Sequence, residues 1–315
     1  MSKKLKHTVR SLIDYLPNRM HERQRSRDLS AERVHYSEQD LRADLDKVPV
    51  PRGATVLVHS SLKAIGYVEG GPATVVNALI DSVVTLREGT LLFPTYSING
   101  TMYQTLKEAA TSQQVVFDAI KTPSNLGAIP EAFRKHPDAV RSVHPTHSFA
   151  AIGPEAKRLV ATHHTCGSNF GRGSPMAEIL DGSGWLLGLG TNLGNVTLYH
   201  CVEEIETDFP FNVYTNDSPF DVKCRDADRN VHVMRLGAHD SRVSRTRIDR
   251  PENAAIRNFY TQWFEQHADM QWHTVCEARS WFISAKRLYD EAAKLMRSGI
   301  TIYTSEAQLA ERSNA

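Results

Sequence analysis

The sequence lacks any long apolar run. No stretch approaches the roughly 20 consecutive apolar residues that a membrane-spanning helix needs. The chain begins with a lysine-rich segment at residues 1–6, but the apolar core of a secretory signal does not follow it. We therefore expect a cytoplasmic protein that has no membrane partner.

Cysteine is scarce and widely spaced. The four cysteines are Cys166, Cys201, Cys224 and Cys276, and none of them forms a Cys-x-x-Cys pair of the kind that holds structural zinc. A disulfide framework is typical of much shorter secreted chains. We expect free and mostly buried thiols, no metal site, and no permanently bound cofactor. The 14 histidines allow a metal site without implying one.

Neither sign of charge is in excess. The chain has 37 Lys and Arg against 36 Asp and Glu, for a net charge of +1. Nothing in this balance favours a nucleic-acid partner. The local basic run at residues 21–28 is interpreted as a solvated face. At 315 residues and 41% hydrophobic content, the chain can form one large or two ordinary globular domains.

The first 48 residues differ from the rest in composition. They are highly charged, with a short apolar face at residues 12–16, and Ser37 precedes an acidic turn as a helix N-cap would. We interpret residues 1–48 as an accessory helical segment that packs on the main domain or on a second subunit, which allows a homodimer. Residues 49–315 are predicted to form the main domain.

Strand and helix patterns alternate in the first half of the main domain. Apolar, β-rich runs at residues 55–59, 90–94 and 184–190 predict buried strands, and residues 73–86 predict a helix with Pro72 in its first turn. This alternation is typical of an α/β fold.

The hydrophobic pattern of the sequence changes after residue 208. Alternating patterns predict short antiparallel strands at residues 211–214, 220–223 and 231–234. Two helices are predicted at residues 254–267 and 284–297. Gly299 ends the second helix, and a final short strand is predicted after it at residues 300–303.

One stretch combines a strand end, glycines and titratable side chains. The run at residues 184–190 predicts a buried strand, and a Gly-rich turn and a helix follow it. On that helix, His200, Glu203 and Glu204 are spaced i, i+3 and i+4 and share one face. An imidazole with neighbouring carboxylates can act as a general base with an orienting group. On spacing alone, such a pair is more often part of a solvated helix face, and the strand and the Gly-rich turn before it favour the functional interpretation.

Three other segments offer ligand-binding groups. A strand tip, hydroxyl residues and paired glycines at residues 59–71 can bind a phosphate or a thioester carbonyl through backbone N–H groups, and an ordinary loop is the alternative. Thr95 follows the strand at residues 90–94 and faces a ligand or a turn. His144 and His147 invite a metal-site interpretation, but Pro145 between them excludes a regular helix, so structural or substrate-loop roles are favoured.

Six blocks in this order resemble the aminoglycoside 3-N-acetyltransferase family, which is unrelated in fold to the common GNAT acetyltransferases. The blocks lie at residues 58–62 with 65–66 and 70–71, 93–97, 123–127, 141–148, 173–175 and 197–203. The matched region covers roughly residues 50–210, and the rest of the chain is matched poorly.

The resemblance implies a three-layer α/β/α fold with a mixed central sheet. It also implies that the acyl group of acetyl-CoA, a co-substrate, passes directly to an amine of an aminoglycoside or related amino sugar. His200 would be the general base and Glu203 its orienting partner. The implied coenzyme-binding residues are His59, Ser60, Ser61, Leu62, Ile65, Gly66, Thr95 and Ser124. The implied acceptor-binding residues are Tyr96, His144 and Glu204.

Other functions stay open at the level of sequence. An N-acyltransferase that acts on a nucleotide-linked amino sugar or another biosynthetic amine would use the same residues. A metal-dependent hydrolase would use His144, His147, His200 and Glu203 as ligands, and stoichiometric zinc in the purified protein would favour it. A non-catalytic relative is disfavoured because both His200 and Glu203 are present.

Overall fold

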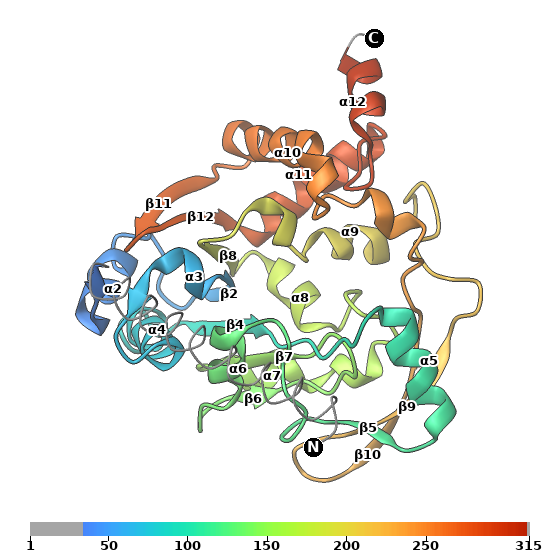
Figure 1. The fold of residues 1–315 in the computed structure, drawn as a ribbon, viewed down its shortest axis with the longest axis horizontal. Helices are drawn as coiled ribbons and strands as arrows, with labels where there is room; N and C mark the ends of the chain where they lie inside the picture. The colour runs from blue at the N-terminus through green and yellow to red at the C-terminus, as the bar shows by residue number, and fades with distance from the viewer. Residues whose placement is uncertain (1–33, 314–315) are drawn as a thin grey trace, which may run out of the picture.

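The computed structural model describes residues 34–313, and Figure 1 shows their arrangement. The apolar face predicted at residues 12–16 and the basic run at residues 21–28 lie outside the described residues. Within that range, no helix has the length and apolar character needed to cross a membrane.

A mixed seven-stranded sheet forms the centre of the described chain. Its two parallel pairs join β2 to β4 and β2 to β8, and the outer strands pair antiparallel. The strand order is β11 (Gln271–Val275), β12 (Ala278–Ser284), β8 (Gly184–Leu189), β2 (Thr55–Ser60), β4 (Thr90–Pro94), β7 (Phe149–Ile152) and β6 (Val140–Arg141). The expected mixed central sheet is confirmed.

Separate apolar cores cover the two faces of this sheet. Successive side chains of a strand point to opposite faces, so Leu57 joins one core while Val56 and Val58 join the other. One core is packed by α2 (Glu38–Leu45), α3 (Leu62–Ile65), α4 (Pro72–Leu79) with its π-helical continuation Ile80–Thr85, and α6 (Ala128–Arg134). The other is packed by α7 (Ala156–Ala161), α8 (Pro175–Glu178), α9 (Tyr199–Ile205), α10 (Ala254–His267) and α11 (Ala285–Arg297). The three-layer α/β/α prediction is therefore confirmed.

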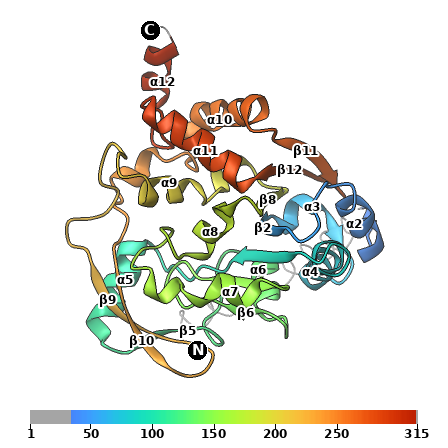
Figure 2. The same ribbon diagram turned by 180° about the vertical axis from the view of Figure 1, so that it is seen from behind.

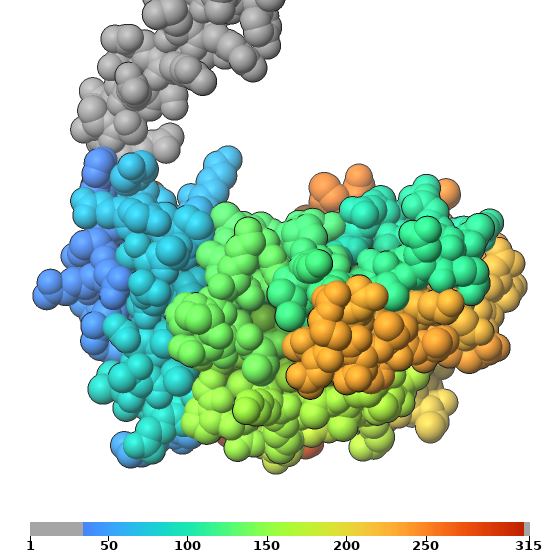
Figure 3. All heavy atoms as spheres, turned by 90° about the horizontal axis from the view of Figure 1, so that it is seen from below, coloured from blue at the N-terminus to red at the C-terminus, as the bar shows by residue number. Residues whose placement is uncertain are grey.

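A smaller sheet lies at one end of the molecule. It has the order β10 (Val231–Leu236), β9 (Phe220–Arg225) and β5 (Val115–Asp118), and α5 (Met102–Ser112) packs with it around a third apolar cluster. Figure 3 shows the yellow-orange hairpin lying against the green middle part of the chain. Figures 1 and 2 place α10, α11 and α12 (Glu306–Ser313) at the opposite end.

Two predicted strands are wrong. Residues 211–214 form no strand, and Tyr214 makes only an isolated bridge with His239. Residues 300–303 turn back on themselves instead: the Thr301 N–H donates to the Thr304 hydroxyl, and the Thr304 N–H donates to the Thr301 carbonyl. Because these backbone groups are satisfied locally, they are not available for a ladder.

The described part of the N-terminal segment belongs to the main body. Ser37 caps α2, and Asp40 returns the hydrogen bond in a capping box, as expected. Leu41 and Leu45 are buried in the core that includes α4. A short parallel pair of β1 (His35–Tyr36) and β3 (Tyr67–Val68) holds the same region. Residues 34–45 therefore pack directly on the main domain.

Candidate active site

The loop between β8 and α9 is held closely against the neighbouring strands. Gly190 adopts a positive φ of 70°, and a Cβ there would lie 2.5 Å from the Ala64 Cβ. The Trp281 indole N–H donates to the Thr191 carbonyl over 2.8 Å. These contacts direct the chain from the edge of the sheet into α9, which carries His200 and Glu203.

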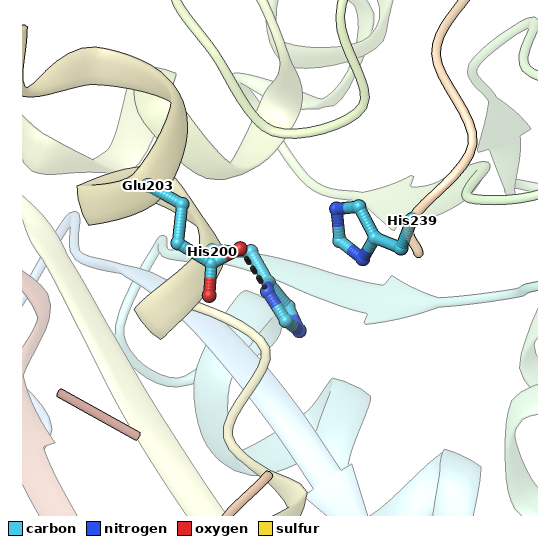
Figure 4. Close-up of side chains that lie close together, drawn as sticks. All are labelled: His200, Glu203 and His239. Carbon is cyan, nitrogen blue, oxygen red and sulfur yellow. Dashed lines mark hydrogen bonds and ion pairs between the residues drawn. The ribbon is translucent and has the colours of Figure 1, made fainter. Parts of the chain in front are cut away.

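His200 and Glu203 form a buried pair on one face of α9. The His200 Nδ1 lies 2.8 Å from the Glu203 Oε2, and the two side chains are 8% and 1% exposed (Figure 4). The Phe170 ring stacks on the imidazole at 5.2 Å between ring centroids. Because Nδ1 is paired with Glu203, Nε2 is the imidazole nitrogen that can exchange a proton with a ligand.

Glu203 is held in its charged form. Burial alone would raise its pKa, but the charge and hydrogen bond of His200 outweigh burial, and the net pKa is lowered. A buried carboxylate that remains ionised can fix the tautomer of the imidazole and stabilise its protonated form.

His239 joins this pair, although the sequence analysis did not single it out. It follows β10, and its ring lies 5.0 Å from the His200 ring between centroids. Burial lowers its pKa to about 3, so the ring is neutral at ordinary pH. No sequence spacing relates His239 to α9, because the β9–β10 hairpin separates them along the chain.

These three residues also have the donor types of a metal site. His200, Glu203 and His239 each offer one ligand atom, and these atoms all lie within 4.8 Å of one another. The set expected for a metal-dependent hydrolase is not assembled, because His144 stacks on His163 at 4.5 Å instead of joining this group.

A cavity of about 520 Å³ opens beside the pair. Five of the residues expected to contact ligands line it: His59, Ser60, Ser61, Tyr96 and His200. The loop residues Thr191–Thr197, the ring of Phe170, and the segment from His239 to Arg250 contribute further walls. The strand end, the Gly-rich loop and α9 therefore meet at one concave surface.

Several buried polar atoms at the cavity have no partner within residues 34–313. They include the His59 Nε2, the Ser60 Oγ and the Thr191 Oγ1. Burial lowers the pKa of His59 to about 4, so its ring is neutral. An unpaired buried polar atom costs about 1–3 kcal/mol, which a polar ligand in the cavity would offset.

Thr95, Ser124 and His144 do not line this cavity. The Thr95 hydroxyl is fully buried, where it donates to the Ser148 carbonyl and accepts from the Arg141 Nε. The Ser124 Oγ accepts from the Leu126 N–H. The His144 Nδ1 accepts from the His147 N–H over 2.9 Å. The Thr95 hydroxyl is fully engaged within the protein, whereas the His144 Nε2 is buried without a hydrogen-bond partner among the described residues. None of the three residues lines the cavity, so the ligand contacts expected for them stay predictions.

Glu204 also points away from the cavity. Its carboxylate accepts from the Phe170 N–H over 2.8 Å and from the Tyr214 hydroxyl. Burial raises its pKa. The expected contact with a cationic substrate is not supported, because one oxygen is engaged by Phe170 and the other by Tyr214.

The remaining residues that were expected to contact the coenzyme pack within the protein instead. Leu62 and Ile65 pack against the core that includes α4. Gly66 has a φ of 98°, and a Cβ there would lie 2.9 Å from the Glu277 carboxylate. Leu62, Ile65 and Gly66 thus shape the loop after β2 without lining the cavity themselves.

A three-layer α/β/α fold with a buried His–carboxylate pair at a cavity defines a protein arranged for proton transfer to or from a bound ligand. The sequence profile of the aminoglycoside 3-N-acetyltransferases matches residues 57–297. The chain therefore belongs to the aminoglycoside 3-N-acetyltransferase family.

Curated relatives support this assignment over part of their length. Aminoglycoside N(3)-acetyltransferase VIII of Streptomyces fradiae is 37% identical over 169 residues, which are 51% of this chain and 58% of the relative. The YokD protein of Bacillus subtilis, described as aminoglycoside N(3')-acetyltransferase-like, is 32% identical over 53% of this chain and 64% of its own. The chain thus spans about three fifths of the length of these relatives.

Solved structures extend the similarity to most of the chain. The aminoglycoside acetyltransferase AAC(3)-Xa superposes with a TM-score of 0.68 and 27% identity, covering 85% of this chain and 94% of its own. AAC-VIa, solved with sisomicin bound, gives a TM-score of 0.66 and 25% identity over 84% and 99%. AAC-IIIb, solved with CoASH, gives a TM-score of 0.69 at 20% identity over 85% and 98%, which shows the shared fold.

Proposed function

We propose that this protein is a CoA-dependent N-acetyltransferase that moves the acetyl group of acetyl-CoA directly to an amine of an aminoglycoside or related amino sugar. The observation that carries the proposal is the His200–Glu203 pair, whose imidazole lines a cavity. The cavity wall from His59 to Ser61 is the proposed site of the coenzyme. Membership of the family supports both assignments.

The chemistry requires removal of a proton from the amine. A sugar ammonium is a poor nucleophile until it loses a proton, and His200 would accept that proton at Nε2 while Glu203 holds the Nδ1 proton. The amine nitrogen forms its bond to the thioester carbon, and the carbon–sulfur bond then breaks. The CoA thiolate leaves and regains a proton. No acyl-enzyme is needed, and burial raises the pKa of the Cys201 thiol well above its usual range, which disfavours a nucleophilic role.

The developing oxyanion needs hydrogen-bond donors near the thioester carbon. The hydroxyls of Ser60, Ser61 and Thr191 lie at the cavity and are suited to this role. Thr95, which the sequence offered for it, is disfavoured because Ser148 and Arg141 engage its hydroxyl.

A nucleotide-linked amino sugar is a second candidate for the acceptor. Asp249 is the only carboxylate among the described residues that line the cavity, and the Arg247 guanidinium already binds it over 2.7 and 2.8 Å. Arg250 adds a second guanidinium at the same rim. A polycationic aminoglycoside would find no carboxylate without a partner here, whereas an anionic group on the acceptor would find the guanidinium of Arg250.

Release of the CoA thiol with a panel of amines tests the proposed function. The panel should hold aminoglycosides, neutral amino sugars and nucleotide-linked amino sugars at equal concentration. We expect release that depends on both acetyl-CoA and an amine, with a matching acetylated product by mass spectrometry. Thiol release without any acetylated amine would indicate a hydrolase and contradict the proposal.

The assembly and location of the protein are part of the same proposal. We propose a homodimer in the cytoplasm, where acetyl-CoA is supplied. Sedimentation of the full chain, compared with a chain that begins at residue 34, tests whether the N-terminal segment contributes to association.

A further inference from the structure

The strongest additional feature of the structure is the group formed by His200, Glu203 and His239. All three side chains are buried, and their ligand atoms lie within 4.8 Å of one another. Figure 4 shows the Glu203 carboxylate and the two imidazoles turned toward a common space. Two imidazoles and one carboxylate are a common zinc ligand set when a fourth position is open to solvent or substrate.

The unpaired ligand atoms of these groups favour binding of a metal ion. The Glu203 Oε1 is buried without a hydrogen-bond partner among the described residues. The His239 Nε2 has no hydrogen-bond partner among the described residues. His200 and His239 both line the cavity, which leaves an open direction for a further ligand. A metal ion would also offset the cost of burying the Glu203 charge.

One charged neighbour opposes a cation at this position. The Arg247 guanidinium acts electrostatically on both Glu203 and His239. However, Arg247 is held in a two-pronged ion pair by Asp249, which cancels much of its charge.

We propose that His200, Glu203 and His239 form a binding site for a divalent transition-metal ion, preferably zinc, and that the bound ion inhibits acetyl transfer. A tetrahedral zinc ion at about 2.0–2.1 Å from each nitrogen holds its ligand atoms roughly 3.3 Å apart, so the ligand atoms that are now up to 4.8 Å apart need to approach, which side-chain rotation can supply. The inhibitory half rests on the proposed function, whereas metal binding itself does not.

Inhibition is expected in both cases, whether the ion binds the Nδ1 or the Nε2 of His200. Coordination through Nδ1 requires the other tautomer of the neutral ring, in which the proton has moved from Nδ1 to Nε2, so Nε2 cannot accept another from the amine. Coordination through Nε2 occupies the basic lone pair directly. In both cases the base is lost. Because the ion competes with a proton, its apparent affinity should rise with pH.

Cobalt spectroscopy on the full chain tests the site without relying on activity. Metal-free protein titrated with Co²⁺ should give the intense visible absorption of a four-coordinate ion, and one equivalent of Zn²⁺ should remove it. Replacing His239 with Ala should weaken Zn²⁺ binding by at least about tenfold, since loss of an outer neighbour alone costs that much. His239→Gln, of similar size, serves as a second variant if the Ala variant does not fold.

His164→Ala is the matched control. His164 pairs with His232 at 4.3 Å between ring centroids, at a different cavity of the molecule, and should leave Co²⁺ binding at the proposed site unchanged. Absence of Co²⁺ absorption in the wild-type chain, or an unchanged Zn²⁺ affinity in folded His239 variants, would overturn the site.

Activity then separates the inhibitory proposal from the proposed function. Zn²⁺ should suppress acetyl-CoA-dependent thiol release, and a chelator should restore it. If the metal-free protein transfers no acetyl group but still shows the Co²⁺ spectrum, the metal site stands and the proposed function fails. Zn²⁺ that raises the rate would overturn inhibition and favour a metal-dependent hydrolase.

Discussion

The Nδ1 of His200 lies 2.8 Å from the Oε2 of Glu203, one turn further along α9. Glu203 is almost completely buried, and its neighbours keep it ionised against the cost of burial. A buried carboxylate in this position can set the tautomer of the imidazole, and in the proposed function Nε2 would then be the proton acceptor at the cavity. The pair thereby links the helix geometry to the proposed chemistry.

Replacing His200 with Ala should lower kcat for acetyl transfer by roughly 10²–10⁴-fold, the usual contribution of a general base. Binding of CoA should survive, because the base acts on the amine and not on the coenzyme. Steady-state thiol release and calorimetry measure the two quantities separately. A folded variant with near-normal kcat at saturating amine would refute the assignment, and His147 and His239 would become the next candidates for the base because both line the cavity.

Glu203→Gln should lower kcat less than His200→Ala, because the imidazole remains. The amide can still hydrogen-bond Nδ1, but it cannot balance the charge of a protonated ring. We expect the rising limb of the kcat–pH profile to move to lower pH in the variant, with a lower plateau, since the amide removes the negative charge that stabilises the protonated ring. Comparison of kcat–pH profiles for the two proteins checks this. Superimposable profiles would show that Glu203 has only a structural role.

Ser61→Asp should weaken CoA binding. Ser61 lies at the cavity, and its N–H donates to the Leu189 carbonyl, which fixes the loop after β2. A carboxylate there would repel the coenzyme phosphates and crowd the pantetheine. Calorimetry with CoA measures the effect, and Ser112→Asp on the exposed end of α5 is the control. Equal affinities for the two folded variants would place the coenzyme elsewhere.

The sequence predicted the elements whose patterns are local. The strand at residues 184–190, the helix that follows the Gly-rich loop, and the His200–Glu203 spacing are all read from neighbouring residues. Those segments correspond to β8 and α9, and the helix spacing brings the imidazole and carboxylate together. Pro72 in the first turn of α4 follows the same logic.

The parts that the sequence did not predict depend on contacts between distant segments. His239 reaches α9 only because the β9–β10 hairpin returns the chain, and no spacing in the sequence encodes that approach. Thr95 and Glu204 have residue types suited to ligands, but Arg141 and Tyr214 bind them from elsewhere in the chain. The hairpin of β11 and β12 was missed because its turn at Cys276 uses a positive φ of 53° without a glycine.

A chain that begins at residue 34 should fold and bind CoA as the full chain does, because α2 is retained. A chain that begins at residue 49 should be less stable. It loses the buried side chains of Leu41, Leu45 and Val48, each worth about 1.5–3 kcal/mol, and the Asp44 carboxylate that accepts from the Cys276 N–H. Thermal unfolding of the two chains measures the difference. Equal melting temperatures would support the boundary at residue 48, whereas the packing of α2 argues for an earlier one.

Lowering the pH should destabilise the fold at a pH well above the range in which its carboxylates become protonated. Burial lowers the pKa of His59 and His163 to about 4 and that of His239 to about 3, so the unfolded chain takes up these protons first. Their stabilising contribution is complete above about pH 6.5, the pKa of a histidine in an unfolded chain, and is lost as the pH falls toward 4. Each such histidine should remove about 1.4 kcal/mol of stability per pH unit in that window.

Urea unfolding between pH 7 and pH 5 checks this dependence, and His163 is the most informative residue to change. Its neutral ring is satisfied on both sides, with the Ser142 hydroxyl at Nδ1 and the Asn169 carbonyl at Nε2. His163→Gln should lower stability at pH 7, because these hydrogen bonds are altered, but it should also reduce the slope of stability against pH by one proton. His267→Gln, at an exposed position of α10, should leave the slope unchanged. A slope that His163→Gln does not alter would mean that the His163 pKa is not depressed by burial.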